Sequence, residues 1–478
     1  MSQKPYYVTT TIPYVNADPH VGFALEVVQA DVFARDKRAA GHEVFFSCGT
    51  DEHGQKIWDN AREQDQSAQE YVDHYADRFK QLRDKLDLSY DSFIRTTDPH
   101  HIEAAREMWR RCSQNGYIYK ANYQSKYCIG CELEKQDSDL DEHGNCPLHP
   151  NKALELRDEE NYFFAFSKLQ KQLQTLWSRD DFVVPDFRLN EMRSLAENEG
   201  LKDFSISRLA SKMPWGVPVP EDPEHVMYVW FDAFVNYIST LDWPDNTEQF
   251  GQFWNGETNI QFAGKDQVRQ QAAMWQAMLI AADLPGTAKI FIHGFIQSNG
   301  QKMSKSIGNV VEPYSLVEKY GTDALRYYLL RHIHPTEDSD FTIEKFHEAY
   351  MASLVNGLGN LVSRVLNMAD KYGVSLEQGV IAEDLFLIEQ FRFNDHMDAV
   401  WKLIQNADQF ISEEQPFKKA KDDLPAAQDD LRYLLGQLWI INQHLVSVMP
   451  ETHEKIARAI ENNKKPDEPL FPRIEFNK

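Results

Sequence analysis

Four side chains of the kinds that bind metals lie in one short stretch of the sequence. Cys128 and Cys131 are separated by two residues, and after fourteen more residues Cys146 and His149 repeat that spacing. Three thiolates and one imidazole complete a tetrahedral set for zinc and leave no position for water, as is typical of a structural site. The sequence therefore predicts one structural zinc ion, the alternative being free thiols in a reducing compartment.

A second candidate site lies where a predicted strand gives way to a predicted helix. Asp18 is placed to cap the helix, Pro19 suits its first position and His20 falls in its first turn. Backbone amides and the helix dipole attract anions at that end, His20 adds a donor and Gly22 leaves room for close approach. The pattern fits a nucleotide phosphate, although a capped helix with an early histidine is also an ordinary structural feature.

A lysine-rich segment far along the chain can supply positive charge. Residues 300–308 read Gly-Gln-Lys-Met-Ser-Lys-Ser-Ile-Gly and hold Lys302, Ser304 and Lys305 between glycines that let a loop close. Lysine is a mobile point charge suited to the charge that builds on a transferring phosphoryl group. We expect this loop to act on a phosphate, the alternative being an exposed basic loop.

The two phosphate-site segments together resemble the paired signatures of class I aminoacyl-tRNA synthetases. His-Val-Gly-Phe begins at His20, and Lys-Met-Ser-Lys-Ser begins 282 positions later at Lys302. Further segments, like the zinc knuckle, are similar to the methionyl branch of that family, and the resemblance runs through essentially the whole chain. These segments are Ile12-Pro13-Tyr14-Val15-Asn16, Gly49-Thr50-Asp51-Glu52-His53-Gly54, Tyr228-Val229-Trp230-Phe231-Asp232-Ala233, Gly264-Lys265-Asp266 and His293-Gly294.

The resemblance implies that the chain activates methionine with ATP to methionyl-adenylate and pyrophosphate, and then transfers methionine to the 3′-terminal adenosine of tRNA(Met). Asp51 would bind the α-ammonium group, and Mg²⁺ would accompany ATP. The implied catalytic residues are His20, Lys302 and Lys305. The implied ATP-binding residues are these three with Gly22, Gly264, Asp266 and Ser304. The implied methionine-binding residues are Ile12, Tyr14, Asp51, Trp230, Ala233, Tyr237 and Gln271, because a thioether packs well beside aromatic rings.

The sequence departs from the family pattern at four positions. Phe23 stands where the first signature usually has a second histidine, so one phosphate contact is missing or comes from water or backbone. Gln267 and Gln271 stand where the family commonly has an aliphatic residue and a histidine beside methionine. A buried glutamine can hydrogen-bond sulfur or a tyrosine hydroxyl, but its own amide needs partners. Phe417 stands where a tryptophan typically stacks on the anticodon.

The order of predicted elements indicates an α/β Rossmann-type catalytic domain split by an insertion and followed by an all-α bundle. Strands are predicted at 6–11, 44–48, 226–230, 260–263 and 290–292, with helices at 19–39 and 266–282. Three apolar stripes, at 354–368, 393–411 and 431–448, predict the bundle. By resemblance the bundle binds the anticodon through Asn360, Arg364 and Phe417.

We expect six parts in chain order. They are the first half of the Rossmann domain (1–116), a connective insertion with the zinc knuckle (117–222), the second half of the Rossmann domain with the lysine loop (223–318), a stem-contact linker (319–350), the helical anticodon-binding domain (351–465) and a tail (466–478).

Composition and charge restrict the class of protein. The net charge of −24 means that any surface for RNA must be local. No apolar run approaches the ~18 residues of a membrane span, and the N-terminus has no signal or transit segment. Five cysteines are an odd, sparse set that argues against a disulfide framework. We expect a cytoplasmic protein with no membrane contact. We also expect a monomer, because no room remains after the bundle for the barrel of about 100 residues that joins two chains in some family members.

Two other interpretations remain open at this point. Another class I synthetase, for cysteine or a branched aliphatic amino acid, would share both signatures. The branched group, however, carries large editing insertions, and the cysteinyl enzyme holds zinc in its amino-acid pocket. A non-catalytic paralogue that binds tRNA would tolerate Phe23 and the two glutamines.

We predict that methionine, and no other standard amino acid, supports ATP-pyrophosphate exchange, because Asp51 and the aromatic residues fit its ammonium and thioether groups. The measurement is the incorporation of labelled pyrophosphate into ATP with each amino acid in turn. Faster exchange with isoleucine or cysteine would overturn the methionine assignment, and no exchange with any amino acid would favour the paralogue.

Overall fold

The structure is a computed structural model that describes residues 4–131, 133–135, 139–298, 300–303, 309–383 and 385–476. The chain divides into two units. Unit 1 comprises Met1–Asp18, Val44–Gln81 and Tyr90–Ile292, and unit 2 comprises Pro19–Glu43, Leu82–Ser89 and His293–Lys478. None of the helices among the described residues combines the length and the apolar character needed to cross a bilayer.

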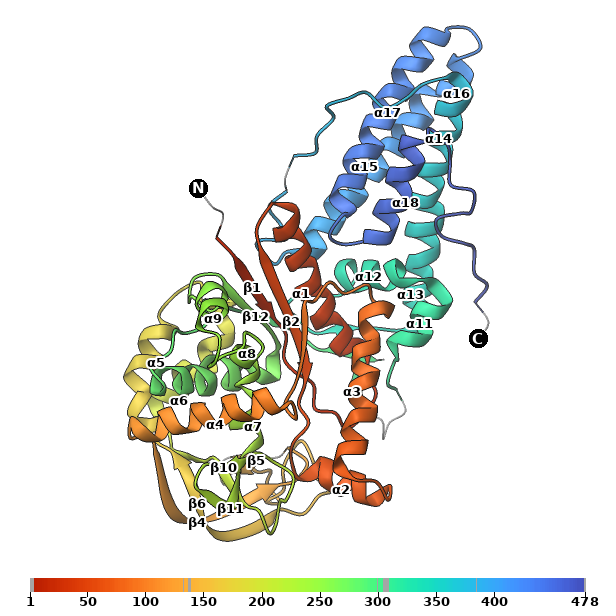
Figure 1. Cartoon of the computed structure of the whole chain (residues 1–478). Coiled ribbons are helices and arrows are strands. Elements are labelled where there is room, and N and C mark those ends of the chain that lie inside the picture. Colours follow the sequence, from red (N-terminus) through yellow and green to blue (C-terminus); the bar gives the residue numbers. More distant parts are fainter. Residues whose placement is uncertain are drawn as a thin grey trace. The chain divides into compact units, whose positions relative to one another are not determined.

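A six-stranded sheet forms the centre of unit 1 (Figure 1). β1 pairs in parallel with β2 on one side and with β12 on the other. All six residues of β12 are buried, as expected for a parallel strand covered on both faces. The order of the strands is β3 (Ser92–Arg95), β2 (Val44–Thr50), β1 (Tyr6–Thr9), β12 (Asn259–Gly264), β13 (Lys289–His293) and β7 (Val183–Val184).

Short helices accompany this sheet, and their apolar faces contribute to a core that includes four fully buried tryptophans, Trp177, Trp243, Trp254 and Trp275. Trp177 and Trp254 each donate the indole N–H to a backbone carbonyl, so that burial leaves neither group unsatisfied. The α-helices that begin in unit 1 are α2 (Gln55–Glu63), α3 (Ala68–Lys85), α4 (Pro99–Gln114), α5 (Gln170–Trp177), α6 (Asn190–Asn198), α7 (Val229–Ala233), α8 (Asn236–Ser239), α9 (Thr247–Phe253) and α10 (Gln276–Ala281). Single helical turns are η2 (Phe166–Leu169), η3 (Asp186–Leu189), η4 (Lys265–Gln267) and the π-helical η5 (Gln270–Trp275).

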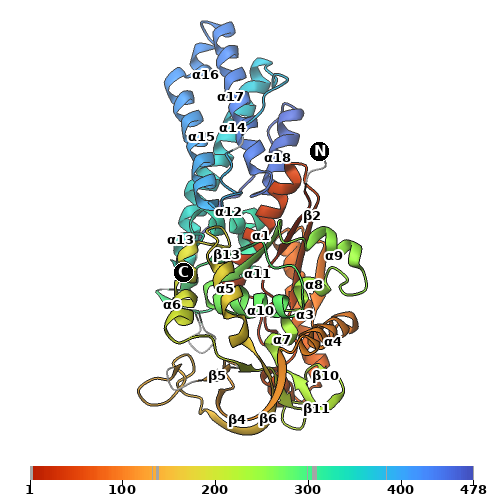
Figure 2. The ribbon, with the colours of Figure 1, turned by 90° about the vertical axis from the view of Figure 1, so that its left-hand side faces the viewer.

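The insertion contributes to two antiparallel sheets (Figure 2). β4 (Ile118–Cys128) and β6 (Glu155–Phe164) pair over ten positions and form the long ribbon of this region. β5 (Leu133–Lys135) and β8 (Phe204–Ser205) complete that sheet. A second, three-stranded sheet has the order β10 (Pro218–Val219), β11 (Asp222–Met227) and β9 (Ser207–Leu209).

One predicted strand of the central sheet is wrong. Residues 226–230 were expected to extend the parallel sheet, but Val226 and Met227 end β11, which pairs antiparallel with β9. The chain turns at Tyr228 and enters α7. The apolar run Val-Met-Tyr-Val-Trp has strand-like composition, and a short apolar run alone cannot separate a strand from a buried helical turn.

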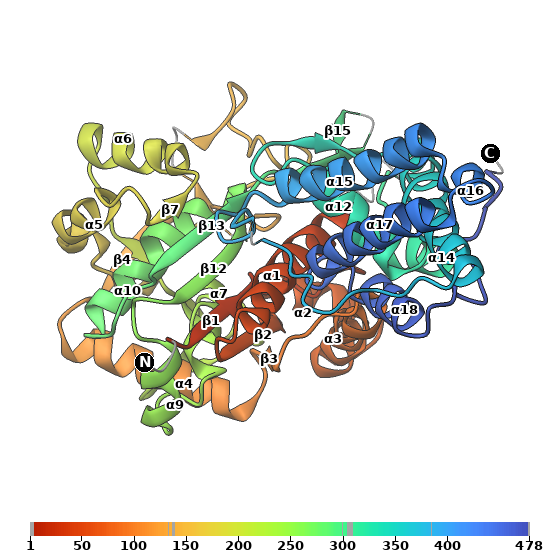
Figure 3. The same ribbon diagram turned by 90° about the horizontal axis from the view of Figure 1, so that it is seen from above.

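Unit 2 contains the predicted helical bundle, whose helices α15 and α17 run obliquely across the view in Figure 3. The three predicted stripes lie on η6 (π-helical, Tyr350–Gly359) with α14 (Asn360–Tyr372), on α15 (Phe393–Glu414) and on α17 (Leu424–Leu445). Leu354, Leu361, Val400 and Leu434 are fully buried, which confirms the stripes as the bundle core. The other elements are α1 (Val21–Ala39), α11 (Pro313–Tyr320), α12 (Thr322–Arg331), α13 (Ile343–Ala349), α16 (Pro416–Lys419), α18 (Pro450–Glu461), β14 (Ile296–Ser298), β15 (Gln301–Lys302) and β16 (Ser339–Asp340).

Arg326 on α12 joins four segments of unit 2 through a fully buried guanidinium group. Its Nη2 lies 2.8 Å from a carboxylate oxygen of Asp31 on α1. Burial raises the pKa of Asp31, but Arg326, Arg35 and Ser89 outweigh burial and hold that pKa below its ordinary value. The guanidinium also donates to three backbone carbonyls, those of Leu86, Ser447 and Val448.

We predict that Arg326→Met lowers the free energy of unfolding by about 3–5 kcal/mol, because it leaves the Asp31 carboxylate buried without its main counter-charge. The measurement is urea unfolding followed by circular dichroism, together with the thermal midpoint. Arg458→Met is the control. Arg458 pairs with Glu454 on the surface, its side chain is 68% exposed, and little change is expected. Equal effects of the two substitutions would contradict the role of Arg326.

Candidate functional site

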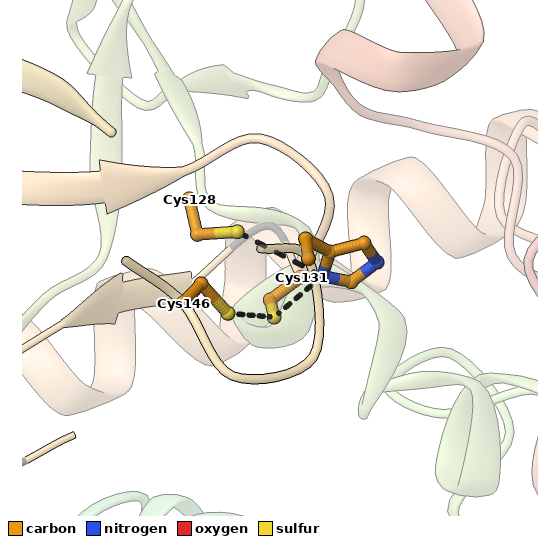
Figure 4. A group of neighbouring side chains, drawn as sticks. Cys128, Cys131 and Cys146 are labelled. Atoms are coloured by element: carbon orange, nitrogen blue, oxygen red, sulfur yellow. Dashed lines mark hydrogen bonds between the residues drawn. The ribbon is translucent and has the colours of Figure 1, made fainter. Parts of the chain in front are cut away.

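The four predicted metal ligands come together at the end of β4 (Figure 4). Their ligand atoms all lie within 4.8 Å of one another. Cys131 Sγ is 3.4 Å from Cys146 Sγ and 3.2 Å from His149 Nδ1, and Cys128 Sγ is 3.8 Å from the same nitrogen. Cys128 and Cys146 are fully buried. Three sulfurs and one ring nitrogen in this arrangement fit a tetrahedral zinc ion.

The surroundings of these ligands affect both their approach to one another and their protonation. A Cβ atom at Gly130 would lie 2.5 Å from the ring of His149, so the glycine between the first two cysteines permits the approach of the fourth ligand. Burial raises the pKa of the Cys131 thiol to about 12. Burial also acts to raise the pKa of Cys146, but hydrogen bonds from Cys131 and the Leu148 amide outweigh it and lower that pKa. The two thiols lie within hydrogen-bond distance of each other, and zinc binding would release thiol protons.

The start of α1 differs from the prediction in its cap. The helix begins at Val21, and His20, in an extended conformation, is the capping residue. Its Nδ1 accepts hydrogen bonds from the backbone N–H groups of Gly22 (3.1 Å) and Phe23 (3.3 Å). Asp18 instead accepts a hydrogen bond from Arg78. The cap prediction was wrong because an extended histidine can supply the accepting atom as well as an aspartate can.

The capping bond determines what His20 can offer to a ligand. Since Nδ1 accepts two backbone protons, the ring proton of the neutral imidazole lies on Nε2, and the ring is exposed. A Cβ atom at Gly22 would lie 2.9 Å from this ring, so the glycine makes room for the histidine. The amide of Phe23 already serves the cap, and this role requires nothing of the phenylalanine side chain.

Only part of the lysine loop can be described. The backbone of Lys302 pairs with Gln297 in the β14–β15 hairpin. The side chain of Lys302, and the whole of Ser304 and Lys305, lie outside the described residues. Their predicted roles at the phosphates therefore stay predictions.

In unit 1, several of the predicted methionine-binding residues follow the carboxyl ends of neighbouring strands. Ile12 and Tyr14 follow β1, and Asp51 follows β2. Tyr14 and Asp51 form a parallel bridge, in which the Asp51 amide donates to the Pro13 carbonyl and the Val15 amide donates to the Asp51 carbonyl. Asp51 is 6% exposed. The order of strands reverses between β1 and β12, because β2 and β3 lie on one side of β1 whereas β12 and β13 lie on the other, and such switch points are where ligands bind in open α/β sheets.

The residue after Asp51 anchors this segment through a buried ion pair. Glu52 is fully buried, and Arg95 donates to both of its carboxylate oxygens, at 2.7 and 2.9 Å. Burial lowers the pKa of Arg95, but hydrogen bonds to Glu52 and Asp73 outweigh it and raise that pKa. The paired charges fix the backbone on which Asp51 is carried, and Thr50 donates to the same carboxylate.

The predicted aromatic residues Trp230 and Tyr237 lie on the short helices α7 and α8 and are packed against neighbouring side chains. Tyr237 is 2% exposed and accepts a hydrogen bond from Gln271 Nε2 at 2.7 Å. This is one of the partners expected of a glutamine at position 271. Ala233 is buried on α7, and the buried indole N–H of Trp230 has no hydrogen-bond partner among the described residues. The same is true of the buried side-chain oxygen of Gln267.

The remaining predicted residues lie in different surroundings. Gly264 ends β12 and is buried, whereas Asp266 is exposed in the turn that follows. In unit 2, Asn360 is exposed at the start of α14, and Arg364 pairs with Asp408 of α15 at 2.9 Å. Phe417 on α16 is 43% exposed.

Some supporting residues were missed by the sequence interpretation. Arg95 and His101 lie outside every motif, and no local pattern marks them. Asp232 and Glu52 fall inside quoted segments, but nothing in those segments indicates that their carboxylates are buried and shared. Their importance arises from partners 43 to 179 positions away.

Comparisons with known proteins agree with this arrangement. The sequence matches the family described as "tRNA synthetases class I (M)" over residues 6–155 and 148–366. It is 38% identical to the methionine-tRNA ligase of Synechocystis sp., with 96% of this chain and 90% of that protein covered. It is 36% identical to the corresponding ligase of Thermotoga maritima, with 96% and 76% covered.

Solved structures give the same result for the fold. Mycobacterium tuberculosis methionyl-tRNA synthetase in complex with methionyl-adenylate matches with a TM-score of 0.90 and 33% identity, covering 98% of this chain and 100% of that chain. The apo form of the synthetase from the same organism gives a TM-score of 0.83 at 31% identity, with 99% of each chain covered. The predicted fold class, an α/β catalytic part with an insertion and a helical C-terminal region, is thereby confirmed. The chain belongs to the class I tRNA synthetases of the M type, the family of the methionine-tRNA ligases.

Proposed function

We propose that this chain joins methionine to ATP, forming methionyl-adenylate and releasing pyrophosphate, and then transfers methionine to the 3′-terminal adenosine of tRNA(Met). The observation that carries the proposal is the Tyr14–Asp51 bridge at the carboxyl ends of β1 and β2. It holds a buried carboxylate beside the switch point of the sheet, in a chain that matches a methionyl-adenylate complex over 98% of its length.

In this proposal Asp51 receives the α-ammonium group of methionine. A carboxylate makes strong, charge-assisted hydrogen bonds to an ammonium group, and burial strengthens them. Ile12, Tyr14, Trp230, Ala233 and Tyr237 contact the thioether, with Gln271 holding the hydroxyl of Tyr237. The indole N–H of Trp230, which has no partner among the described residues, is available to a bound ligand.

The residues that act on the phosphates lie at the start of α1 and in the lysine loop. A methionine carboxylate oxygen attacks the α-phosphorus of ATP, and pyrophosphate leaves with the bonding electrons. The His20 Nε2–H and the ammonium groups of Lys302 and Lys305 oppose the charge that builds on the phosphate oxygens, and Gly22 leaves room for the nucleotide to approach. Mg²⁺ bound with ATP would supply further positive charge against the phosphate oxygens. Ser304, Gly264 and Asp266 complete the nucleotide contacts, the last two at the ribose.

The second step transfers methionine to tRNA. A hydroxyl of the terminal adenosine attacks the carbonyl carbon of the adenylate, and AMP leaves. Asn360, Arg364 and Phe417 read the anticodon, because exposed aromatic and polar side chains recognise unstacked bases. Arg364 must exchange or share its Asp408 partner to do so. Zinc, held by Cys128, Cys131, Cys146 and His149, stabilises the knuckle without an open position for catalysis.

We predict that Asp51→Asn raises the KM for methionine by about 10- to 100-fold, the equivalent of one charge-assisted hydrogen bond, and leaves the KM for ATP within about threefold. The measurement is ATP-pyrophosphate exchange. Asp77→Asn, an exposed aspartate on α3, is the control and should match the parent protein. Equal losses for methionine and ATP would remove Asp51 from the ammonium site.

We also predict that the purified protein holds one zinc ion per chain and that Cys128→Ser with Cys131→Ser abolishes zinc binding. The central sheet should survive, because the knuckle lies on the β4–β6 ribbon. The measurements are elemental analysis and circular dichroism. Cys112→Ala, a buried cysteine outside the cluster, should retain the full zinc content. A doubly substituted protein that still holds zinc would contradict the ligand set.

A further inference from the structure

A buried carboxylate on α7 is shared between two histidines from distant parts of unit 1. Asp232 is fully buried, and its Oδ2 lies 2.6 Å from Nδ1 of His53 while its Oδ1 lies 3.0 Å from Nε2 of His101. His53 is 5% exposed and His101 is fully buried. Burial raises the pKa of Asp232, but the two imidazoles outweigh it and hold the pKa at about 2. The group is therefore a carboxylate that accepts hydrogen bonds from both rings.

The chemistry of a carboxylate dictates the direction of these hydrogen bonds. An ionised carboxylate can only accept, so Nδ1 of His53 and Nε2 of His101 both carry protons. Nδ1 of His101 lies 2.9 Å from the hydroxyl of Ser239 on α8. The chain of contacts thus runs from His53 through Asp232 and His101 to Ser239. At its centre both histidines donate and the Asp232 carboxylate accepts.

This chain connects the two sides of the proposed methionine site. His53 follows Asp51 by two residues, and Asp232 lies between Trp230 and Ala233. Backbone hydrogen bonds hold each segment locally, at Pro13 and Trp215 for the His53 side and within the short α7 helix for the other. The segment after Thr50 has left β2, and α7 is a five-residue helix without a side-chain cap. The His53–Asp232 hydrogen bond joins positions 179 apart in sequence and spans the two segments directly.

A tryptophan from the insertion supports the His53 side. The Trp215 indole N–H donates to the Glu52 carbonyl at 2.6 Å, and the Trp215 ring lies edge-on to His53 with 5.6 Å between the ring centroids. The Gly54 amide donates back to the Trp215 carbonyl. The imidazole of His53 is therefore clamped between Trp215 and Asp232.

We propose that Asp232, with His53 and His101, is a positioning residue for methionine. It sets the distance between the Asp51 carboxylate and the Trp230 indole ring. The inference rests on the proposed function. It assigns none of the three residues a contact with the reacting atoms. A misplacement of about 1 Å between binding groups is enough to weaken a site by a large factor, and such sites depend on supporting residues held by packing and hydrogen bonds.

The test compares three substitutions of His53 in the full chain. The amide nitrogen of asparagine can take the position of Nδ1, whereas that of glutamine corresponds to Nε2. We expect His53→Ala and His53→Gln to raise the KM for methionine by about tenfold or more. The turnover number and the KM for ATP should stay within about threefold of the parent. His53→Asn should restore the KM for methionine to within about threefold of the parent. His101→Gln and His101→Ala form a second pair, because glutamine preserves the donor at Nε2.

The control is another buried histidine–carboxylate pair in the same unit. His225 Nδ1 lies 3.0 Å from Asp222 on β11, and Nε2 lies 3.0 Å from the Glu160 carbonyl. His225→Ala should lower the thermal midpoint without changing the KM for methionine. A fall in the thermal midpoint of a His53 variant is compared with the fall measured for His225→Ala.

Each outcome separates the two proposals. A parent protein that shows no methionine-dependent exchange refutes the proposed function. A parent protein that is active, with asparagine no better than glutamine at position 53, refutes the positioning role and leaves the function standing. Parallel changes in the KM for methionine, the KM for ATP and the turnover number would also refute it, because they indicate general loss of structure. Selective rescue by asparagine supports the proposal, and it does so even where the alanine variant fails to fold.

Discussion

The parallel pairing of β1 with both of its neighbours is the constraint from which the rest of unit 1 follows. Tyr6 to Thr9 pair in register with Val44 to Ser47 of β2, and the same short strand pairs with β12 from Asn259 to Gln261. Because all three strands run in one direction, the chain leaves them at one edge of the sheet. Ile12, Asp51 and Gly264 are carried to that edge by backbone geometry. A slip of one residue would turn the buried side chains of β1 to its opposite face.

Three buried carboxylates with charged or imidazole partners hold segments that the sheet does not fix. Glu52 with Arg95, Asp232 with two histidines, and Asp31 with Arg326 are each desolvated and each hydrogen-bonded. Such groups contribute little net stability relative to apolar residues, but removing one partner is costly because the other remains buried and charged. Their distribution is informative. Two of the three groups brace the segment from Thr50 to Gly54, and the third holds α1 within unit 2.

Two of the four departures from the family pattern, at Gln271 and Phe23, have physical explanations that fit activity. Gln271 is not an isolated buried amide, since its nitrogen donates to Tyr237 and its backbone carbonyl accepts from Gln276. Phe23 follows a histidine that already caps α1, and its amide contributes to the cap. The negative net charge is also compatible with local binding of RNA, although several basic residues are committed to ion pairs. Arg364 pairs with Asp408, and Lys419 pairs with Glu414 and Asp430.

The sequence alone determined those features that depend on residues close together along the chain. The cluster of three cysteines and one histidine was predicted from spacing, because two short knuckles close one loop. The bundle was predicted from apolar periodicity, because a helix places every third and fourth residue on one face. The split α/β fold followed from the order of strands and helices, and the similar structures confirm it.

Tertiary structure decided the features that depend on distant partners. Residues 226–230 have strand composition, but the pairing of β11 with β9 and the packing of α7 end the strand at Met227. His20 caps α1 because of its extended backbone, which no residue type specifies. Arg95 and His101 gained their roles only when folding brought Glu52 and Asp232 to them. A sequence pattern records spacing along the chain, whereas the energy of a buried charge depends on which group lies within 3 Å of it in space.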